Sequence, residues 1–390
     1  MWIARGSENL LRRMADQFPA VLVTGARQAG KTSILRHLYP QASYLSLDLP
    51  ANAEAAHTAP EQLLEQHPEP VIIDEIQYAP SLLRHLKYRI DGDRSPGRYL
   101  LTGSQVFPLM QGVSESLAGR CAILNLHTLS RAELLEAGRP IEETSYIFLG
   151  GYPELHVGAE AGLWFPAYVA TYLERDVRNI LRVVDLQDFN RFIRACALRS
   201  SQVLNYSDLA RDTGIAPNTA RKWLSLLQTS AVVTLIEPYF GNRTKRLIKS
   251  PKLVFLDTGL AVFLAGFRSE EDLFASSLAG AFWESHVFGQ IVRQAASQGD
   301  STLINYWRTA NGPEVDLVIE QAGGTVMAIE CKWKEHPDIA DAAGLRALDQ
   351  AEKGRIKEKF VVCRTKVSYQ LSDGTWVVNL SELLKNLKMG

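Results

Sequence analysis

Long apolar runs are missing from this chain of 390 residues. No stretch approaches the roughly 18 consecutive apolar positions that a membrane-spanning helix needs, and Met1–Phe18 mixes charged and polar groups where a signal peptide would be apolar. Paired cysteines are missing too, because no two of the four have the spacing of a disulfide framework or a thiolate zinc site. We expect a soluble, cytoplasmic protein without membrane contact, whose cysteines are reduced core residues: Cys121, Cys196, Cys331 and Cys363.

An excess of one charge is also absent. The chain has 42 Lys and Arg against 43 Asp and Glu, a formal net charge of -1. Any binding of nucleic acid must therefore come from a local basic surface. The length exceeds one ordinary domain of roughly 100 to 200 residues, so two or three domains are expected.

The hydrophobic pattern divides the chain into four parts. Short apolar strands alternate with helices over 1–160, which predicts an α/β unit with a parallel sheet. Apolar spacing of three and four over 161–199 predicts a helical connector. A helix-turn-helix pattern and a strand pair occupy 200–266, and a helix, a hairpin and further strands over 267–390 predict a small final α/β unit.

A phosphate-binding loop is present at Gly25–Thr32, which reads G-x-x-x-x-G-K-T between a predicted strand and a predicted helix. Its glycines let backbone N–H groups turn toward phosphates, and the next helix offers its positive end. We expect Lys31 to contact the β and γ phosphates of ATP and the Thr32 hydroxyl to bind Mg²⁺. The predicted nucleotide-binding residues are Gly25, Ala26, Arg27, Gln28, Ala29, Gly30, Lys31, Thr32 and Ser33, together with Asp74.

Two carboxylates end the apolar strand Val71–Glu75. Core formation alone disfavours this, since buried charges need partners. We predict that Asp74 holds Mg²⁺ and that Glu75 orients and deprotonates the attacking water. The alternative is a pair of solvated loop acids.

Two further residues are candidates for contact with the nucleotide. The strand that ends in Thr102 to Gln105 should lie beside Asp74 in a parallel sheet, so Ser104, or instead Thr102 or Gln105, is predicted to sense the γ-phosphate. Arg120 is predicted to act as an arginine finger on the nucleotide of its own subunit or of a neighbour in a homo-oligomer. The alternative for Arg120 is an ordinary surface arginine.

Several strings together suggest a family. FPAVLVTGARQAGKT, VIIDEIQ, ESLAGR, TYLERDV and YWRTANGPEVDLVIE resemble a bacterial and archaeal family of AAA-type ATPases whose carboxyl half is a domain of unknown function. The resemblance covers nearly the whole chain and implies ATP binding. It leaves the substrate and the physiological role open.

The helix-turn-helix pattern predicts a DNA contact. A first helix opens at Tyr206 with Ser207 as its cap, Gly214 makes the turn, and Pro217 starts a second helix. Ala220, Trp223, Leu224 and Leu227 share the buried face of that second helix, and a basic loop between the following strands forms a wing. The predicted DNA-binding residues are Arg221, Lys222, Lys245, Arg246 and Lys249. The alternative is a packing module with a solvated loop.

The final unit contains three acids and a lysine of interest. Glu284 lies in a predicted helix, Asp316 in a strand, and Glu330 and Lys332 in the next strand. A two-residue turn would put Asp316 and Glu330 on opposite faces, whereas a three-residue loop that includes Ala322 puts them directly opposite each other; we predict the longer loop.

A convergent cluster of Glu284, Asp316 and Glu330 would bind one or two Mg²⁺ or Mn²⁺ ions that activate water at a phosphodiester. Lys332 would stabilise the developing negative charge. The arrangement resembles the PD-(D/E)xK nucleases, although the proline here, Pro313, stands three residues before Asp316.

Three functions follow as alternatives. The first is an ATP-dependent enzyme that binds and cleaves DNA. The second is a nucleotide-switched DNA-binding regulator with an inactive nuclease-like unit. The third is an ATPase whose carboxyl half binds other proteins.

Overall fold

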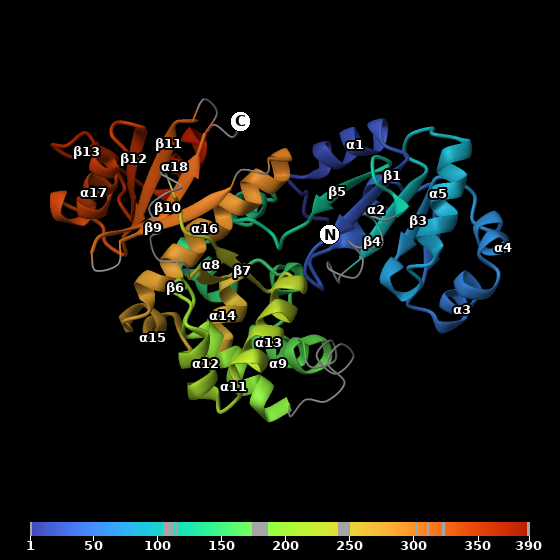
Figure 1. The fold of residues 1–390 in the computed structure, drawn as a ribbon, viewed down its shortest axis with the longest axis horizontal. Helices are drawn as coiled ribbons and strands as arrows, with labels where there is room; N and C mark the ends of the chain where they lie inside the picture. Colours follow the sequence, from blue (N-terminus) through green and yellow to red (C-terminus); the bar gives the residue numbers. More distant parts are fainter. Residues whose placement is uncertain are drawn as a thin grey trace.

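In the computed structural model, strands form a five-stranded, a three-stranded and a six-stranded sheet within the described residues (Figure 1). We call them the amino-terminal, the three-stranded and the carboxyl-terminal sheet. The amino-terminal and carboxyl-terminal sheets lie toward opposite ends of the long axis of the molecule. The residues described are 2–103, 113, 116–173, 186–240, 250–300, 303–309, 312–321 and 324–387, with the backbone alone for 172 and 173.

The amino-terminal sheet is parallel throughout, with the order β2-β3-β4-β1-β5. Its strands β1, β3 and β4 are buried along their whole length, which explains their nearly continuous apolar sequence. The register pairs Thr24 with Gly103 and with Asn125, so the carboxyl ends of three strands meet at one edge. The prediction of a parallel α/β unit is confirmed. Its elements are α1 (Glu8–Gln17), β1 (Ala20–Thr24), α2 (Lys31–Leu38), β2 (Ser43–Ser46), α3 (Pro50–Thr58), α4 (Pro60–Glu65), β3 (Val71–Asp74), α5 (Leu82–Gly92), β4 (Tyr99–Gly103) and β5 (Cys121–Asn125).

The middle of the chain is mostly helical and ends in the three-stranded sheet, whose order is β6-β8-β7. Helices α12 and α13 pack together at the predicted turn, where Gly214 has the left-handed φ of 73°. The predicted cap was wrong: the Asn205 side chain, and not Ser207, accepts the N–H groups at the start of α12. The elements are α7 (Arg131–Glu136), α8 (Glu143–Leu149), α9 (Ala161–Tyr168), α11 (Leu186–Ala197), β6 (Gln202–Val203), α12 (Tyr206–Thr213), α13 (Pro217–Thr229), β7 (Val233–Ile236), β8 (Lys252–Phe255), α14 (Thr258–Ala265) and α15 (Glu270–Ala275).

The carboxyl-terminal sheet has the order β13-β14-β12-β11-β10-β9. Met327, Ile329 and Cys331 face the core shared with α16 and α18, whereas Ala328 faces the core shared with α17. This alternation along β11 matches the predicted one. The elements are α16 (Ala279–Gln298), β9 (Ile304–Arg308), β10 (Glu314–Glu320), β11 (Val326–Cys331), α17 (Ala343–Ala351), β12 (Ile356–Val362), β13 (Tyr369–Gln370), β14 (Trp376–Val378) and α18 (Leu380–Asn386).

Helix α16 links the two ends of the molecule. It packs on the carboxyl-terminal sheet and extends toward α1, where Leu10 lies beside Gly299 (Figure 1). One continuous core joins residues from Ile147 to Leu387, so the packing does not break at residue 266. The four cysteines are free thiols. None of the described helices combines the length and apolar character that crossing a bilayer requires.

A buried histidine on α16 makes stability depend on pH. His286 lies among aromatic rings, with ring centroids 5.3 Å from Tyr146 and 5.8 Å from Trp283. Burial, aided by the charges of Arg293 and Arg131, lowers the pKa of His286 to about 3. The neutral form is therefore favoured in the folded state.

We expect the contribution of His286 to the free energy of unfolding to be fully retained above pH ~6.5, the pKa in the unfolded chain, and to fall by about 1.4 kcal/mol per pH unit as pH drops toward the folded pKa. Burial also lowers the pKa of His127 to about 3, so His127 adds a slope of its own in this range. Urea unfolding between pH 7.5 and about pH 5 measures this slope. His286→Phe should reduce it, whereas His57→Phe, at an exposed position of α3, should not. Equal slopes in wild type and His286→Phe would contradict the assignment.

Candidate functional site

The loop between β1 and α2 has the backbone of a phosphate-binding loop. Gly25 has a φ of +140°, and a Cβ there would lie 2.1 Å from the carbonyl oxygen of Leu126. Gly30, with a φ of 95°, stands directly before the first residue of α2. Both glycines are therefore required by the backbone, and the loop leads into the positive end of a helix.

A cavity of about 300 Å³ opens over this loop and is lined mainly by polar groups. Lys31 is buried, and its ammonium donates to the carbonyl oxygens of Gly25 (3.1 Å) and Ala26 (2.8 Å). The cavity brings most of the predicted nucleotide-binding residues together and adds Asp48. Its lining residues are Arg27, Gln28, Gly30, Lys31, Thr32, Ser33, Asp48 and Glu75.

Asp74 is held by three hydroxyl groups. Its Oδ1 accepts from Thr32 (2.7 Å) and Thr102 (2.5 Å), and its Oδ2 accepts from Tyr44 (2.8 Å). The hydrogen bond to Asp74 and burial raise the pKa of Tyr44 to about 12, with burial the larger cause. Thr32 and Asp74 are thus adjacent at the cavity, as expected of residues that share a magnesium ion. Sequence reasoning missed Tyr44, which carries no motif.

Glu75 directly follows β3 and has a left-handed φ of 58°, which is uncommon for glutamate. Its backbone N–H donates to Thr102 Oγ1 at 3.0 Å, and its carboxylate accepts from the Gln77 side chain. The hydroxyl of Thr102 therefore aligns both acids. Glu75 also lines the cavity, in reach of a group bound over the loop.

The other two predicted nucleotide contacts have different outcomes. Ser104 lies outside the described residues. Arg120 directly precedes β5, so it lies at the edge of the sheet opposite the phosphate-binding loop, five strand residues away. Its guanidinium forms a bidentate ion pair with Asp91 (2.7 and 3.1 Å). Arg120 stands about 16 Å from the loop edge, so the prediction that it reaches the nucleotide of its own subunit was wrong. A contact with a neighbouring subunit stays a prediction.

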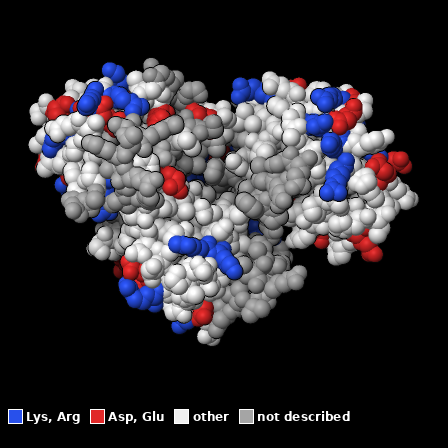
Figure 2. Space-filling view, in the orientation of Figure 1, with Lys and Arg blue, Asp and Glu red and all other residues white. Residues whose placement is uncertain are grey.

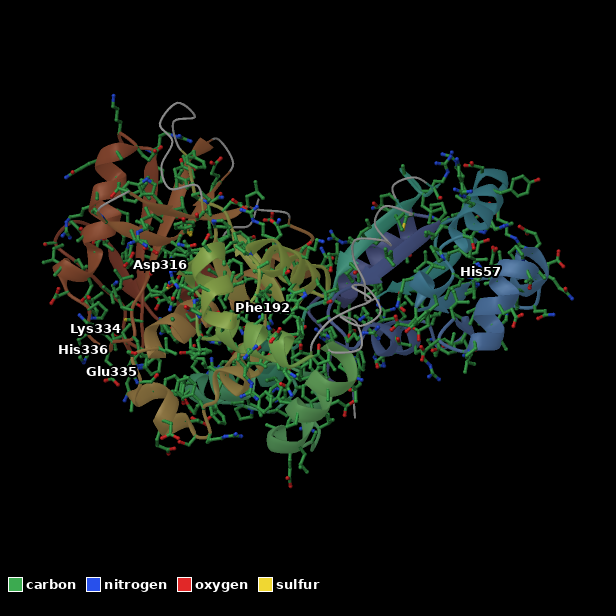
Figure 3. The ribbon with its side chains drawn as sticks, turned by 60° about the horizontal axis from the view of Figure 1, so that its bottom comes forward. His57, Phe192, Asp316, Lys334, Glu335 and His336 are labelled. Carbon is green, nitrogen blue, oxygen red and sulfur yellow. The ribbon has the colours of Figure 1, made fainter. Side chains whose placement is uncertain are left out.

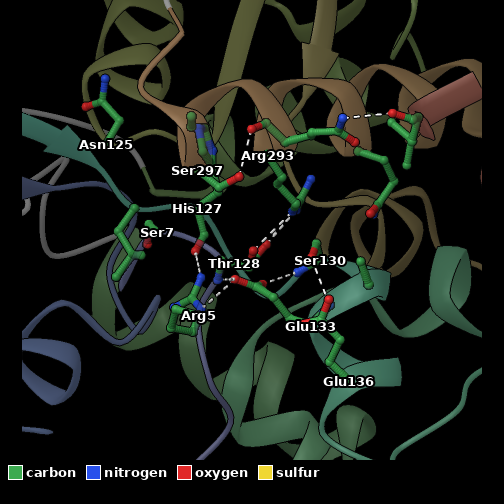
Figure 4. A pocket seen from close by; sticks show the side chains of 17 residues that line it. Arg5, Ser7, Asn125, His127, Thr128, Ser130, Glu133, Glu136, Arg293 and Ser297 are labelled. Atoms are coloured by element: carbon green, nitrogen blue, oxygen red, sulfur yellow. Dashed lines mark hydrogen bonds and ion pairs between the residues drawn. The ribbon is translucent and has the colours of Figure 1, made fainter. Parts of the chain in front are cut away.

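Arg5 ties the phosphate-binding loop to the next part of the chain. Its guanidinium donates to the carbonyl oxygens of Ala29 (2.9 Å) and His127 (2.6 Å), and its Nε pairs with Glu133 at 3.2 Å. Arg5, His127 and Glu133 line a second cavity of about 170 Å³ (Figure 4). Sequence reasoning missed Arg5, because nothing near it in the chain marks its distant partners.

Arg293 joins this region to the carboxyl half. It donates to Thr128 Oγ1 (2.6 Å), to the Thr128 carbonyl (3.1 Å) and to the Leu256 carbonyl (2.8 Å). Thr128 in turn donates to Asp257 at 2.8 Å. Figure 4 shows Thr128 between Arg5 and Arg293. The contacts of Arg5 and Arg293 therefore connect the phosphate-binding loop, through the segment of His127 and Thr128, to α16 and to the end of β8.

The predicted acids meet in the carboxyl-terminal unit, on the side of the molecule away from His57 (Figure 3). The register Leu317↔Ile329 brings Asp316 across from Glu330, and Gln321 N–H donates to the Thr325 carbonyl at 2.9 Å. Three residues close that hairpin, as predicted. Asp316 accepts from the backbone of Cys331 at 2.8 Å.

A lysine that sequence reasoning missed stands within these acids. The Lys252 ammonium, at the start of β8, lies 2.7 Å from Glu284, 2.5 Å from Glu314 and 3.3 Å from Asp316. Only 1% of its side chain is exposed. A lysine in the apolar strand Lys252–Phe255 was the available signal, since a buried charge needs partners.

The electrostatics of this acid cluster follow from burial. Burial and the neighbouring charge of Asp316 raise the pKa of Glu330 to about 8, and the same two causes raise the pKa of Glu284 well above its usual range. Burial alone would lower the pKa of Lys252, but the carboxylates of Glu284, Asp316 and Glu314 outweigh it and raise the pKa. Lys332 pairs with Glu330 at 2.6 Å.

The predicted metal-binding geometry is not seen. Within the described ranges, no three His, Cys, Asp or Glu side chains are arranged around a common metal position. Glu284, Asp316 and Glu330 do converge, but Glu284 and Asp316 are bonded to Lys252 and Glu330 to Lys332. The cations of this cluster are lysines of the chain itself.

The predicted DNA-binding residues are described in part. Arg221 and Lys222 are exposed on α13, whose opposite face is buried as predicted. Figure 2 shows basic side chains at the place of α13 in Figure 1. Arg221 also lies over the Tyr206 ring at 5.1 Å. Lys245, Arg246 and Lys249 lie outside the described residues.

A parallel sheet with β4 between β1 and β3, a phosphate-binding loop after β1 and an acid pair at the end of β3 together define a P-loop ATPase. Residues 17–135 match the AAA domain family, residues 142–271 a domain of unknown function (DUF8612) and residues 279–383 a further one (DUF4143). The chain belongs to a family of AAA-type ATPases that carry these carboxyl-terminal domains.

Relatives in this family are themselves uncharacterised. The uncharacterized proteins Rv2008c of Mycobacterium tuberculosis and Mb2031c of Mycobacterium bovis are each 32% identical over 334 residues, which cover 85% of this chain and 74% of theirs. They establish the family and leave the function open.

Two solved structures are similar in part. The Walker-type ATPase PABY2304 of Pyrococcus abyssi is 16% identical with a TM-score of 0.45, covering 66% of this chain and 94% of that one. The signal transduction ATPase with a tetratricopeptide repeat sensor, PH0952 of Pyrococcus horikoshii, is 13% identical with a TM-score of 0.28, covering 76% and 47%. Both TM-scores are too low to support a functional assignment.

Different residues of the ATP site are expected to serve ATP binding and ATP hydrolysis. We expect Lys31→Ala to weaken ATP binding by about 2 kcal/mol or more, because the phosphates lose a charged hydrogen-bond donor. Glu75→Gln should bind ATP as wild type does but release phosphate roughly 100-fold more slowly or worse, because the amide accepts no proton from water. Equilibrium binding of a fluorescent ATP analogue and single-turnover phosphate release measure the two effects.

Lys87→Ala on α5 and Glu54→Gln on α3 remove the same charges elsewhere and should leave both quantities unchanged. Wild-type turnover in Lys31→Ala and Glu75→Gln would remove these two residues from the ATP site.

Proposed function

We propose that this protein is an ATP-driven switch that acts on DNA. ATP binding and hydrolysis change how the exposed face of α13 and the acid cluster of Glu284, Asp316 and Glu330 engage a DNA strand, and the acid cluster cleaves the strand with a divalent metal. The AAA-type ATPase assignment stands on the family. The coupling to DNA is the proposal.

In this proposal the ATP site works through its own side chains. Lys31 binds the β and γ phosphates, and Glu75 orients the attacking water and accepts its proton. Thr32 and Asp74, 2.7 Å apart at the cavity, are the residues that would hold Mg²⁺. Mg²⁺ would supply charge neutralisation at the phosphates. Ser104 is proposed as the sensor of the γ-phosphate.

Helix α16 is the observation that supports coupling most directly. Glu284, in its first half, contributes to the acid cluster, and Arg293, more than two turns later, bonds to Thr128. Arg5 extends this line to Ala29 in the phosphate-binding loop. A rigid helix held at both sites would transmit a displacement at the ATP site to the cluster.

The layout of α11, α12 and α13 with the sheet β6-β8-β7 supports a winged helix-turn-helix as the DNA-binding element. Arg221 and Lys222 on the exposed face of α13 would contact DNA phosphates. We also propose Lys245, Arg246 and Lys249 as phosphate contacts of the wing.

The order of residues in the acid cluster supports nuclease chemistry. A helix acid, a strand acid and the Glu330-x-Lys332 pair come together at one end of β10 and β11. Glu284, Asp316 and Glu330 would hold Mg²⁺ or Mn²⁺, which would supply an activated water, and Lys332 would stabilise negative charge on the phosphodiester.

A second function is favoured by one specific contact. The Lys252 ammonium bonds to Glu284 and Asp316, and a cluster permanently filled in this way would bind no metal. The protein would then be a nucleotide-switched DNA-binding regulator without cleavage, and hydrolysis would only reset its conformation.

We expect Arg221→Ala/Lys222→Ala to reduce the salt slope of DNA binding by about 2, because two phosphate contacts are lost. Asp316→Asn should bind DNA like wild type but lose cleavage. The measurements are binding of single- and double-stranded DNA between about 50 and 200 mM salt and cleavage with Mg²⁺ or Mn²⁺, each with and without ATP.

Arg84→Ala/Lys87→Ala on α5 removes the same charges and is the matched control for binding. DNA binding without cleavage under every condition would select the regulator. Absence of DNA binding at low salt would select the third function, an ATPase whose carboxyl half binds proteins.

A further inference from the structure

Lys252 belongs to a different sheet from the acids that it contacts. It opens β8 of the three-stranded sheet, whereas Glu314 and Asp316 lie on β10 and Glu284 on α16. Its ammonium has a carboxylate partner for each of its three N–H donors, and the Tyr306 ring lies 5.4 Å away. One strand therefore supplies the central cation of a site built by other elements.

The acid cluster retains unused capacity for a cation. Four carboxylates, those of Glu284, Glu314, Asp316 and Glu330, face the ammonium groups of Lys252 and Lys332, and Arg308 reaches only the outer oxygen of Glu314 at 3.4 Å. Glu330 is 7% exposed, and its buried Oε2 has no hydrogen-bond partner among the described residues. A buried carboxylate oxygen without a partner is costly, and a divalent ion would satisfy it.

We propose that Lys252 is a tethered cation that occupies the acid cluster in place of a divalent metal ion, so that the cluster binds metal only after β8 withdraws the lysine. The inference rests on the proposed metal site and adds its regulation. Lys252 and the metal would compete for the same oxygens of Glu284 and Asp316.

The other end of β8 lies at the junction with the ATPase part. Leu256 and Asp257 follow the strand directly, and both bond within the group formed by Thr128 and Arg293. Lys252 and Leu256 are four residues apart, about 13 Å along an extended chain. A shift at the junction that moves β8 along its own axis would carry the ammonium out of the cluster.

Competition by an internal cation lowers apparent metal affinity by the fraction of molecules in which the cluster is open. If that fraction is about one tenth or less, Lys252→Met should bind Mn²⁺ roughly tenfold more tightly than wild type. Calorimetric titration of the full chain with Mn²⁺, without nucleotide, measures this. The ATP site is removed as a source of signal by Thr32→Val/Asp74→Asn in every arm.

Three controls accompany this titration. Lys252→Arg keeps the charge and should bind Mn²⁺ as weakly as wild type. Lys359→Met removes a lysine of β12 that pairs with Asp349 of α17 at 3.0 Å and should have no effect. Lys252→Met/Asp316→Asn should lose the gain, which assigns the ion to the acid cluster.

Lys252→Met leaves buried carboxylates unpaired and has the potential to unfold the chain. A second measurement therefore uses the Lys252 side chain of wild type itself. Acetylation of lysines, read by mass spectrometry, should be slow at Lys252 and rise several-fold with Mn²⁺, while Lys359 stays constant.

The outcomes are distinct. Equal Mn²⁺ affinity in wild type and Lys252→Met, with unchanged acetylation of Lys252, would overturn the inference and leave the proposed metal site standing. No Mn²⁺ binding in any variant that retains the acids would overturn both. Tighter binding in Lys252→Met that disappears with Asp316→Asn, or Mn²⁺-dependent acetylation of Lys252, supports the inference.

Discussion

The arrangement of this protein depends on the buried guanidinium of Arg293. Its donors are shared among the Thr128 hydroxyl, the Thr128 carbonyl, the Leu256 carbonyl and the Gly289 carbonyl of its own helix, and Asp257 lies 3.7 Å away. A buried guanidinium tolerates burial only when all its donors have acceptors. Its hydrogen bonds connect α16, the end of β8 and the chain leaving β5. The ATP site and the acid cluster are thus linked by the contacts of Arg5 and Arg293 and by the intervening chain of β8 and α16.

The two buried cations, Arg293 and Lys252, differ in how readily their contacts can be replaced. Arg293 is surrounded mainly by neutral carbonyl and hydroxyl groups, whereas Lys252 is held by three carboxylates that a divalent ion can also bind. A divalent ion in solution can compete with Lys252 for its carboxylates, whereas the carbonyl and hydroxyl partners of Arg293 do not attract such an ion in the same way. The Lys252 contacts are therefore the exchangeable ones, and the Arg293 contacts connect the end of β8 to the ATPase part. In this proposal, nucleotide binding displaces the phosphate-binding loop, to which Arg5 is bonded through the Ala29 carbonyl.

Much of the ATP site could be predicted from the sequence because its groups are neighbours in the chain or lie on adjacent strands. The order of the strands alone is enough to place the loop of Gly25 to Thr32 beside the acids at the end of β3. The hairpin register was predictable for the same reason, since one turn length sets it. Arg5, Arg293 and Lys252 were not predictable, because their partners lie up to 128, 165 and 64 residues away, respectively, and only the tertiary fold brings them together. Arg120 was misplaced although its edge follows from the chain order, because a residue directly before a parallel strand lies at the edge opposite the phosphate-binding loop.

In our proposal, nucleotide binding at the ATP site affects the acid cluster through α16 and β8. Hydrogen–deuterium exchange of the Glu75→Gln variant, compared with and without ATP, tests this most directly because it reports backbone opening along the whole chain. We expect ATP to change hydrogen–deuterium exchange in the phosphate-binding loop and also in residues 252–257 and 279–298. Changes confined to residues 17–135 would contradict it.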